Sequence, residues 1–177
     1  DLAGTLDRRL SQNHLTIHTP AARSRLDILV ENTSRVNFSM ALRGERKGIT
    51  GQVTLANKPI TDWQIYSLPM NDPAALHFGS TGDCPGPCFY RATFNIDKPA
   101  DTYLDTRVFT KGFVWVNGHP LGRIWDIGPQ MSLYLPAPWL HKGANDVIVF
   151  DMQGGSGSKQ MQGSAVPLLD SMPSLSR

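Results

Sequence analysis

Residues 111–126 read KGFVWVNGHPLGRIWD, and this stretch decides the fold of the chain. Phe113 to Val116 is aromatic and β-branched, which is typical of a strand. Asn117-Gly118 is a strong turn signal, and an alternating apolar pattern resumes from Leu121 to Trp125. The stretch therefore predicts a β-hairpin.

The hairpin carries side chains that suit a carbohydrate. Between Trp115 and Asp126 there are two tryptophans, an Asn, a His, an Arg and an Asp. Indole faces stack on the C–H surface of a pyranose, and planar polar groups address its hydroxyls. The alternative is that Trp115 and Trp125 are core residues of a sandwich, because large aromatic side chains dominate core burial.

Short strand-like segments, separated by turns rich in Gly and Pro, flank the hairpin on both sides. No segment sustains a period of 3.6 residues, so the chain is predicted to be all-β, with the turn spacing of sandwiches and jelly rolls. From residue 153 the composition becomes that of a linker, and 153–177 is predicted to be a flexible tail. The predicted strands are 14–18, 25–31, 51–56, 60–68, 89–96, 101–109, 131–135 and 146–152, with one helical turn at 136–140.

Composition narrows the classes of protein that this chain could be. Its 177 residues suffice for one domain, or for one domain and part of another, and 40% hydrophobic residues exclude wholesale disorder. The 17 Lys and Arg residues are scattered, so no nucleic-acid surface is predicted. No apolar run approaches the roughly 20 residues that span a bilayer. We therefore expect a soluble chain without a membrane partner.

Cys84 and Cys88 flank a Pro-Gly turn that could bring them together. They could form a local disulfide, remain free thiols or provide half of a metal site, and an oxidising compartment would favour the disulfide. A tetrahedral zinc site needs four ligands, and neither a second cysteine pair nor suitably spaced histidines occur. No metal and no cofactor is predicted.

Catalytic patterns are missing from the sequence. A glycoside hydrolase needs two carboxylates that flank the scissile bond, but the only glutamates are Glu31, in a predicted strand, and Glu45, in a charged loop. The sequence contains no Gly-x-Ser-x-Gly elbow, phosphate-binding loop or His-Glu-x-x-His motif. No catalytic residue is predicted.

Several ordered motifs carry a family resemblance. The hairpin stretch resembles the C-terminal β-domain of β-galactosidases of glycoside hydrolase family 35, and the likeness extends over residues 1 to 152. Two departures weaken a stacking role for the hairpin: Ile124 stands where the family usually has an aromatic, and His119-Pro120 replaces the commoner Phe-Asn. The motifs are 111–118, 121–125, 128–130, 133–136 and 139–140, with 26–32, 35–38, 47–49 and 61–66 upstream.

The resemblance implies a domain organisation. In that family an N-terminal (β/α)₈ barrel carries the catalytic glutamates, and galactose-binding-like jelly rolls follow it. Residues 1–49 would then be the closing strands of an incomplete jelly roll, and 50–152 a complete galactose-binding-like one. None of the barrel motifs occurs in this sequence, so the family's catalytic residues match no position here.

Three functions follow as expectations. In the first, the chain is the non-catalytic C-terminal portion of a secreted or periplasmic β-galactosidase that hydrolyses terminal β-D-galactosides with retention. The chain would be inactive alone, and it would brace the barrel, its expected partner. The second is a free-standing carbohydrate-binding module, and the third is a structural interaction domain. In the module, a terminal galactoside would contact Trp63, Trp115, Asn117, Trp125 and Asp126.

Overall fold

The computed structural model describes residues 2–18, 24–32, 35–79 and 83–169. The chain forms two compact units. The N-terminal unit is Thr5–Pro69, and the sandwich unit is Met70–Arg177 together with Asp1–Gly4. The boundary expected between residues 49 and 50 falls inside the N-terminal unit.

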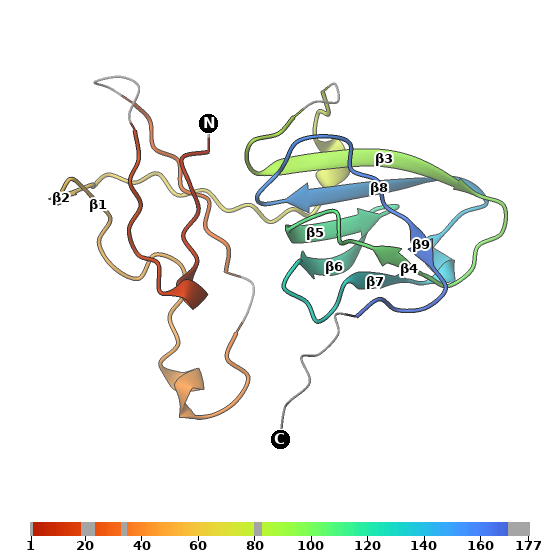
Figure 1. The fold of residues 1–177 in the computed structure, drawn as a ribbon, viewed down its shortest axis with the longest axis horizontal. Helices are drawn as coiled ribbons and strands as arrows, with labels where there is room; N and C mark the ends of the chain where they lie inside the picture. Colours follow the sequence, from red (N-terminus) through yellow and green to blue (C-terminus); the bar gives the residue numbers. More distant parts are fainter. Residues whose placement is uncertain (1, 19–23, 33–34, 80–82, 170–177) are drawn as a thin grey trace. The chain divides into compact units, whose positions relative to one another are not determined.

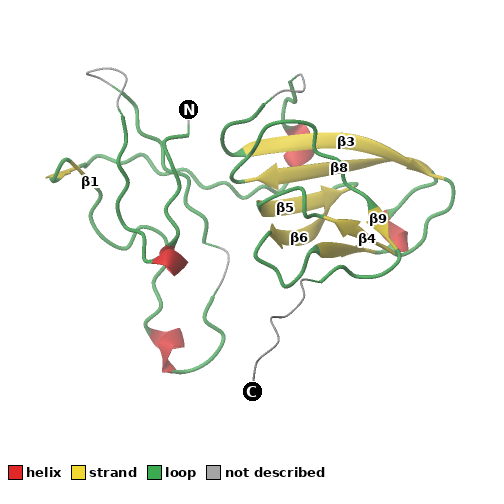
Figure 2. Ribbon diagram, in the orientation of Figure 1, coloured by secondary structure: helices red, strands yellow, loops and turns green. Residues whose placement is uncertain are grey.

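The sandwich unit is built from two antiparallel sheets, so the predicted all-β fold is confirmed (Figures 1 and 2). Helical structure in the described residues is limited to short 3₁₀ turns, one of which, η4 (Ala137–Trp139), lies in the predicted helical turn. The four-stranded sheet has the order β3 (Cys88–Ile96), β8 (Gly143–Asp151), β5 (Lys111–Val116), β6 (His119–Trp125). The three-stranded sheet has the order β7 (Ser132–Leu135), β4 (Thr102–Asp105), β9 (Gly163–Ser164).

The main core lies between the two sheets. Alternate residues of β5 and β8 point into it, because successive side chains of a strand point to opposite faces. Leucines of β4 and β7 meet them from the other sheet. The buried members are Leu104, Phe109, Val114, Val116, Ile124, Leu133, Leu135, Leu140, Val147 and Val149.

A second apolar cluster covers the opposite face of the four-stranded sheet. Trp115, Ile148 and Phe150 are buried there, and Phe89 stacks on Phe150 with ring centroids 4.6 Å apart. Met70 and Phe78 pack on the cluster from the segment that contains η3 (Pro73–Ala75). β5 and β8 are therefore apolar on both faces, which explains the nearly continuous apolar run in the sequence of β8.

The predicted hairpin is confirmed as β5 and β6. Asn117 and Gly118 have φ values of 49° and 79°, as the two central residues of a tight hairpin turn require. The pairing runs from Lys111 opposite Trp125 to Val116 opposite His119, with a register shift between Val114 and Trp115.

Residues 153–169 contact the sandwich and do not form the expected flexible tail. Gly155 pairs with Cys84, β9 pairs with β4, and the backbone N–H of Met131 donates to the carbonyl of Leu168 at 3.0 Å. The linker-like composition misled the prediction because glycines also suit close backbone contacts, and Gly154 and Gly157 have φ values of 67° and 81°. The rest of the predicted tail lies outside the described residues.

The N-terminal unit contains little regular structure in its described part. Its elements are η1 (Arg8–Leu10), η2 (Met40–Arg43) and a two-stranded hairpin of β1 (Thr54–Leu55) and β2 (Lys58–Pro59). The strands predicted at 14–18, 25–31 and 60–68 are not formed there. A strand requires a ladder of hydrogen bonds to a neighbour, and at 60–68 the described structure shows a single such contact, from the backbone N–H of Ile60 to the carbonyl of Val53 at 3.0 Å.

Candidate functional site

Asn117, at the tip of the hairpin, is engaged by its own fold. Its Nδ2 donates to the carbonyl of Trp139 at 2.7 Å and to Asn145 Oδ1 at 2.8 Å, and its Oδ1 accepts from the backbone N–H of Asp146 at 2.9 Å. Asn145 is buried and also bonds to both backbone groups of His141. Asn117 therefore ties the hairpin to η4 and to β8, which is a structural role.

Trp115 and Trp125 lie in different environments. Trp115 is buried in the second apolar cluster. Trp125 is partly exposed, but Lys111 Nζ lies 4.2 Å and Arg123 Cζ lies 4.9 Å from its ring centroid. Both contacts follow from register, because Lys111 is opposite Trp125 and Arg123 precedes it by two residues on the same strand. A cation over an indole competes with a stacked sugar for the same face.

The two remaining predicted sugar contacts are Asp126 and Trp63. Asp126 is exposed just after β6, and its backbone N–H donates to the carbonyl of Thr110 at 2.7 Å. Trp63 belongs to the N-terminal unit, where its Nε1 donates to the carbonyl of Ile60 at 3.1 Å. Four of the five predicted residues thus share one hairpin, in which Trp115 is buried and Lys111 and Arg123 lie over the ring of Trp125.

A tyrosine pair on the outer face of the three-stranded sheet is a site that the sequence analysis missed. Tyr103 of β4 is directly opposite Tyr134 of β7, and their ring centroids are 5.5 Å apart with the planes tilted by 54°. Alternation along each strand could have shown that both rings lie on the face of the sheet that points away from the core leucines. The register that pairs them depends on a connection of some 25 residues, which a pattern cannot supply.

Asp101 adds a carboxylate beside this pair. The backbone N–H of Ala137 donates to Asp101 Oδ1 at 2.8 Å and, with a hydrogen bond from the Tyr134 hydroxyl, holds the pKa of the Asp101 carboxyl below its usual range. The hydrogen bond between Tyr134 and Asp101 raises the pKa of the Tyr134 hydroxyl. Aromatic faces beside an ionised carboxylate are groups that can contact the C–H surface and the hydroxyls of a sugar.

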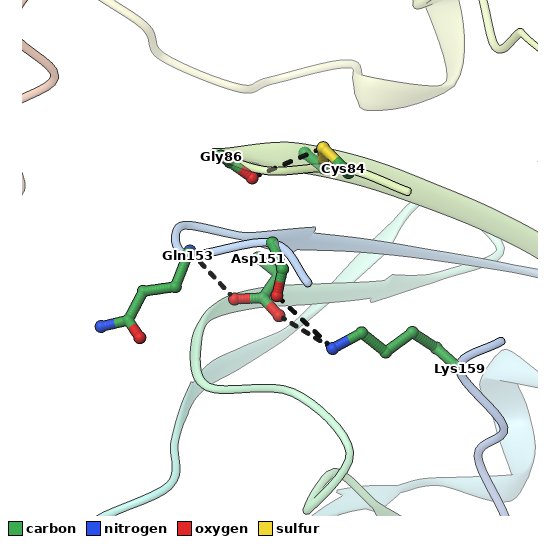
Figure 3. The surroundings of a disulfide bond; sticks show 7 residues. Cys84, Gly86, Asp151, Gln153 and Lys159 are labelled. Atoms are coloured by element: carbon green, nitrogen blue, oxygen red, sulfur yellow. Dashed lines mark hydrogen bonds and ion pairs between the residues drawn. A yellow bond between two sulfur atoms is a disulfide. The ribbon is translucent and has the colours of Figure 1, made fainter. Parts of the chain in front are cut away.

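A buried polar cluster lies where β8 ends (Figure 3). The Asp151 side chain is fully buried, and its Oδ1 accepts from Thr110 Oγ1 at 2.6 Å and from the backbone N–H of Gln153 at 3.2 Å. Lys159 Nζ lies 3.8 Å from Asp151 Oδ2 and donates to the carbonyl of Val108 at 3.0 Å. The cluster neutralises a carboxylate that burial alone would make costly.

Cys84 and Cys88 are joined by a disulfide, one of the three states that the sequence left open. Across the described ranges, no group of three or more His, Cys, Asp or Glu side chains is arranged to hold a metal ion. Nor does any helix in that part of the chain have the length and apolar character to cross a membrane.

Comparison with known proteins finds two domain families in succession along the chain. Residues 1–69 match the family model "Beta-galactosidase, first all-beta domain", and residues 87–145 match "Beta-galactosidase, galactose-binding domain". The chain belongs to the C-terminal β-domain region of the β-galactosidase family. The first match ends where the N-terminal unit ends, at Pro69.

Relatives of this β-galactosidase region occur in bacteria and in animals. A beta-galactosidase of Xanthomonas manihotis is 46% identical over 133 residues, which are 75% of this chain and 22% of that protein. Beta-galactosidase-1-like protein 3 of Homo sapiens is 42% identical over 160 residues, which are 85% of this chain and 24% of the relative. Homo sapiens beta-galactosidase is 34% identical over 174 residues, which are 85% of this chain and 25% of the relative. The chain thus spans about a quarter of the length of these relatives.

Proposed function

We propose that this chain is the non-catalytic C-terminal portion of a β-galactosidase and braces the catalytic barrel of the parent enzyme. The parent would hydrolyse terminal β-D-galactosides with retention of configuration. The observation that carries the proposal is the uncovered apolar surface of the N-terminal unit, which belongs to a β-galactosidase domain family.

That surface consists of large apolar side chains that the described part of the N-terminal unit leaves exposed. Along segment 24–32, Leu26, Ile28 and Val30 are each more than two-fifths exposed, and Ile65 is 91% exposed. Burying one such side chain stabilises a protein by about 1.5–3 kcal/mol. Apolar exposure on this scale is typical of an interaction surface, and the proposed occupant is the remainder of the parent polypeptide.

The state of Glu45 supports placing the catalytic carboxylates elsewhere. The backbone N–H of Val36 donates to Glu45 Oε2 at 2.8 Å and holds the pKa of the Glu45 carboxyl below its usual range, with a further contribution from Lys47. A retaining glycosidase needs an acid/base carboxyl whose pKa is raised, about 5–5.5 Å from a second carboxyl. A carboxylate held ionised by a backbone hydrogen bond suits a structural role.

The test adds the chain to the separately produced catalytic portion of the parent enzyme and measures hydrolysis of a chromogenic β-galactoside after heating. We expect the chain alone to show no turnover, and its addition to prolong the half-life of the catalytic portion several-fold. Ile28→Asp should abolish the protection. The matched control is Ile127→Asp in the sandwich unit, because Ile28 and Ile127 are 42% and 46% exposed.

Two outcomes contradict this proposal. One is turnover by the repurified chain alone, which would place catalysis within these residues. The other is an unchanged half-life of the catalytic portion at saturating concentrations of the chain.

A second candidate function is binding of a terminal galactoside by Tyr103, Tyr134 and Asp101. The exposed Tyr134 ring beside an ionised carboxylate favours it, as does the match to a galactose-binding domain family. Titration with methyl β-D-galactoside to tens of millimolar should quench tyrosine fluorescence, and Tyr134→Ala should abolish the response. Tyr66→Ala is the control, because Tyr66 is 76% exposed and also donates its hydroxyl hydrogen, to Gln64. A response that persists in Tyr134→Ala would exclude this site.

A further inference from the structure

The disulfide loop is paired with the segment that follows β8. We call residues 153–159 the strap. The backbone N–H of Gly155 donates to the carbonyl of Cys84 at 2.8 Å, and the N–H of Cys84 donates to the carbonyl of Gly155 at 3.1 Å. Asp83 Oδ1 also accepts from the backbone N–H of Gly157 at 3.0 Å. Three hydrogen bonds therefore join residues 83–84 to the strap.

The contact between loop and strap is as close as two backbones allow. A Cβ at Gly154 would overlap the carbonyl oxygens of Gly86 and Cys84, and Gly154 has a φ of 67°, a conformation that side chains disfavour. Glycine is thus required at this position for two separate reasons, and the strap lies directly on the loop that the disulfide closes.

The strap carries the counter-ion of a buried carboxylate. Lys159 ends the strap and neutralises Asp151, which has no exposed side-chain surface. Asp151 is also the direct partner of Cys88 in the β3–β8 ladder. Disulfide, strap and ion pair therefore meet at one end of the same strand pair (Figure 3).

We propose that the Cys84–Cys88 disulfide is a redox-sensitive latch that holds the strap, and with it Lys159, on the sandwich. A dithiol reductant breaks the Sγ–Sγ bond by supplying two electrons and two protons. Two thiols form, and the dithiol becomes a cyclic disulfide. The freed loop gains conformational entropy in its open state, so opening of the strap becomes more frequent.

Opening is local because the chain beyond the strap has its own attachments. The backbone N–H of Asp105 donates to the carbonyl of Gln162 at 2.9 Å, and the N–H of Leu168 donates to Ser132 Oγ at 2.8 Å. These contacts involve neither cysteine. Residues 162–168 therefore stay docked when the strap is released.

Hydrogen exchange of the full chain, read by mass spectrometry before and after treatment with dithiothreitol, tests the latch. A disulfide that closes a five-residue loop changes an opening equilibrium by about 30-fold, so reduction should accelerate exchange in 153–159 by that order. Exchange in 162–168 and in β8 should stay unchanged. The double variant Cys84→Ser/Cys88→Ser should exchange like the reduced chain without reductant, and dithiothreitol should not alter it further.

Two glycine substitutions distinguish loss of the contact between loop and strap from backbone strain. Gly154→Ala breaks the loop contact but keeps the disulfide, so the strap should exchange rapidly even when oxidised. Gly157→Ala is the matched control, because Gly157 has a φ of 81° and nothing lies within 4 Å of its would-be Cβ. Its effect should be several-fold smaller. Unchanged exchange of the strap on reduction would overturn the latch, and so would uniform acceleration over the whole sandwich.

Discussion

The hydroxyl of Tyr90 is a buried polar atom without a hydrogen-bond partner in the described structure. Burial, followed by the nearby charge of Asp151, raises the pKa of this hydroxyl. Because an unsatisfied buried hydroxyl costs free energy, Tyr90→Phe should leave the free energy of unfolding unchanged or raise it by about 1 kcal/mol. Urea denaturation measures this. Tyr134→Phe, which removes a bonded hydroxyl, should have the opposite sign, and a clear loss of stability in Tyr90→Phe would reveal a partner.

Substitution of Asn117 should lower the free energy of unfolding, because its side chain makes three hydrogen bonds and its φ is positive. Asn117→Ala leaves these partners without a bond and strains the turn. We expect a loss of about 2–4 kcal/mol in urea denaturation. Asn95→Ala, at an exposed position of β3, should change stability by less than about 0.5 kcal/mol. Equal effects of the two substitutions would contradict the structural role of Asn117.

The carboxylate of Asp101 links the start of β4 to η4, so its ionisation affects how these elements are joined. Its pKa is lowered in the fold, chiefly by the backbone N–H of Ala137. A lowered folded pKa means that the stabilisation is present above the unfolded value of about 4 and is lost as pH falls through the folded value. When the pH falls from about 5 to about 2, the melting temperature should therefore drop less in Asp101→Asn than in the unmodified chain. Parallel profiles would exclude this contribution.

Strands β5 and β8 approach each other too closely at Gly112 for any side chain. A Cβ there would overlap the backbone carbonyl of Phe150, whereas a Cβ at Gly118 would meet nothing within 4 Å. Gly112→Ala should therefore cost more than about 4 kcal/mol or prevent folding, and Gly118→Ala only about 1 kcal/mol, from its positive φ. Thermal melting of both variants distinguishes close approach from backbone strain. Similar melting points would mean that β5 can shift away from β8.

The elements of the sandwich could be read from the sequence where alternation and turn chemistry agree. Asn117-Gly118 located the hairpin, and alternating residues located most of β3 and β7. The tyrosine site could not be predicted in this way, because the register that pairs Tyr103 with Tyr134 is set by residues far apart in the sequence. The strap could not be predicted either, because nothing in the sequence pattern shows that Lys159 is the partner of Asp151. The N-terminal strands were predicted from the pattern of Leu26, Ile28 and Val30, but a pattern shows only which face is apolar. Formation of a strand depends on a neighbour as well.

The two units of the molecule differ in how well they cover their apolar residues. The sandwich encloses two apolar clusters, whereas the N-terminal unit exposes most of its large side chains. We expect the full chain to associate at micromolar concentration and residues 70–177 alone to be monomeric with one cooperative melting transition. Size-exclusion chromatography with light scattering gives both masses. A monomeric full chain would show that the N-terminal unit covers its own apolar surface in solution.

The order of strands in the four-stranded sheet has a consequence for synthesis on the ribosome. β3 is the first strand of this sheet to be made, but its partner is β8, which is the last. At about 5–20 residues per second, the roughly 50 residues between them take several seconds to translate. During that interval the nascent chain presents the unpaired backbone of β3, with Phe89 and Phe94, to chaperones and to neighbouring chains.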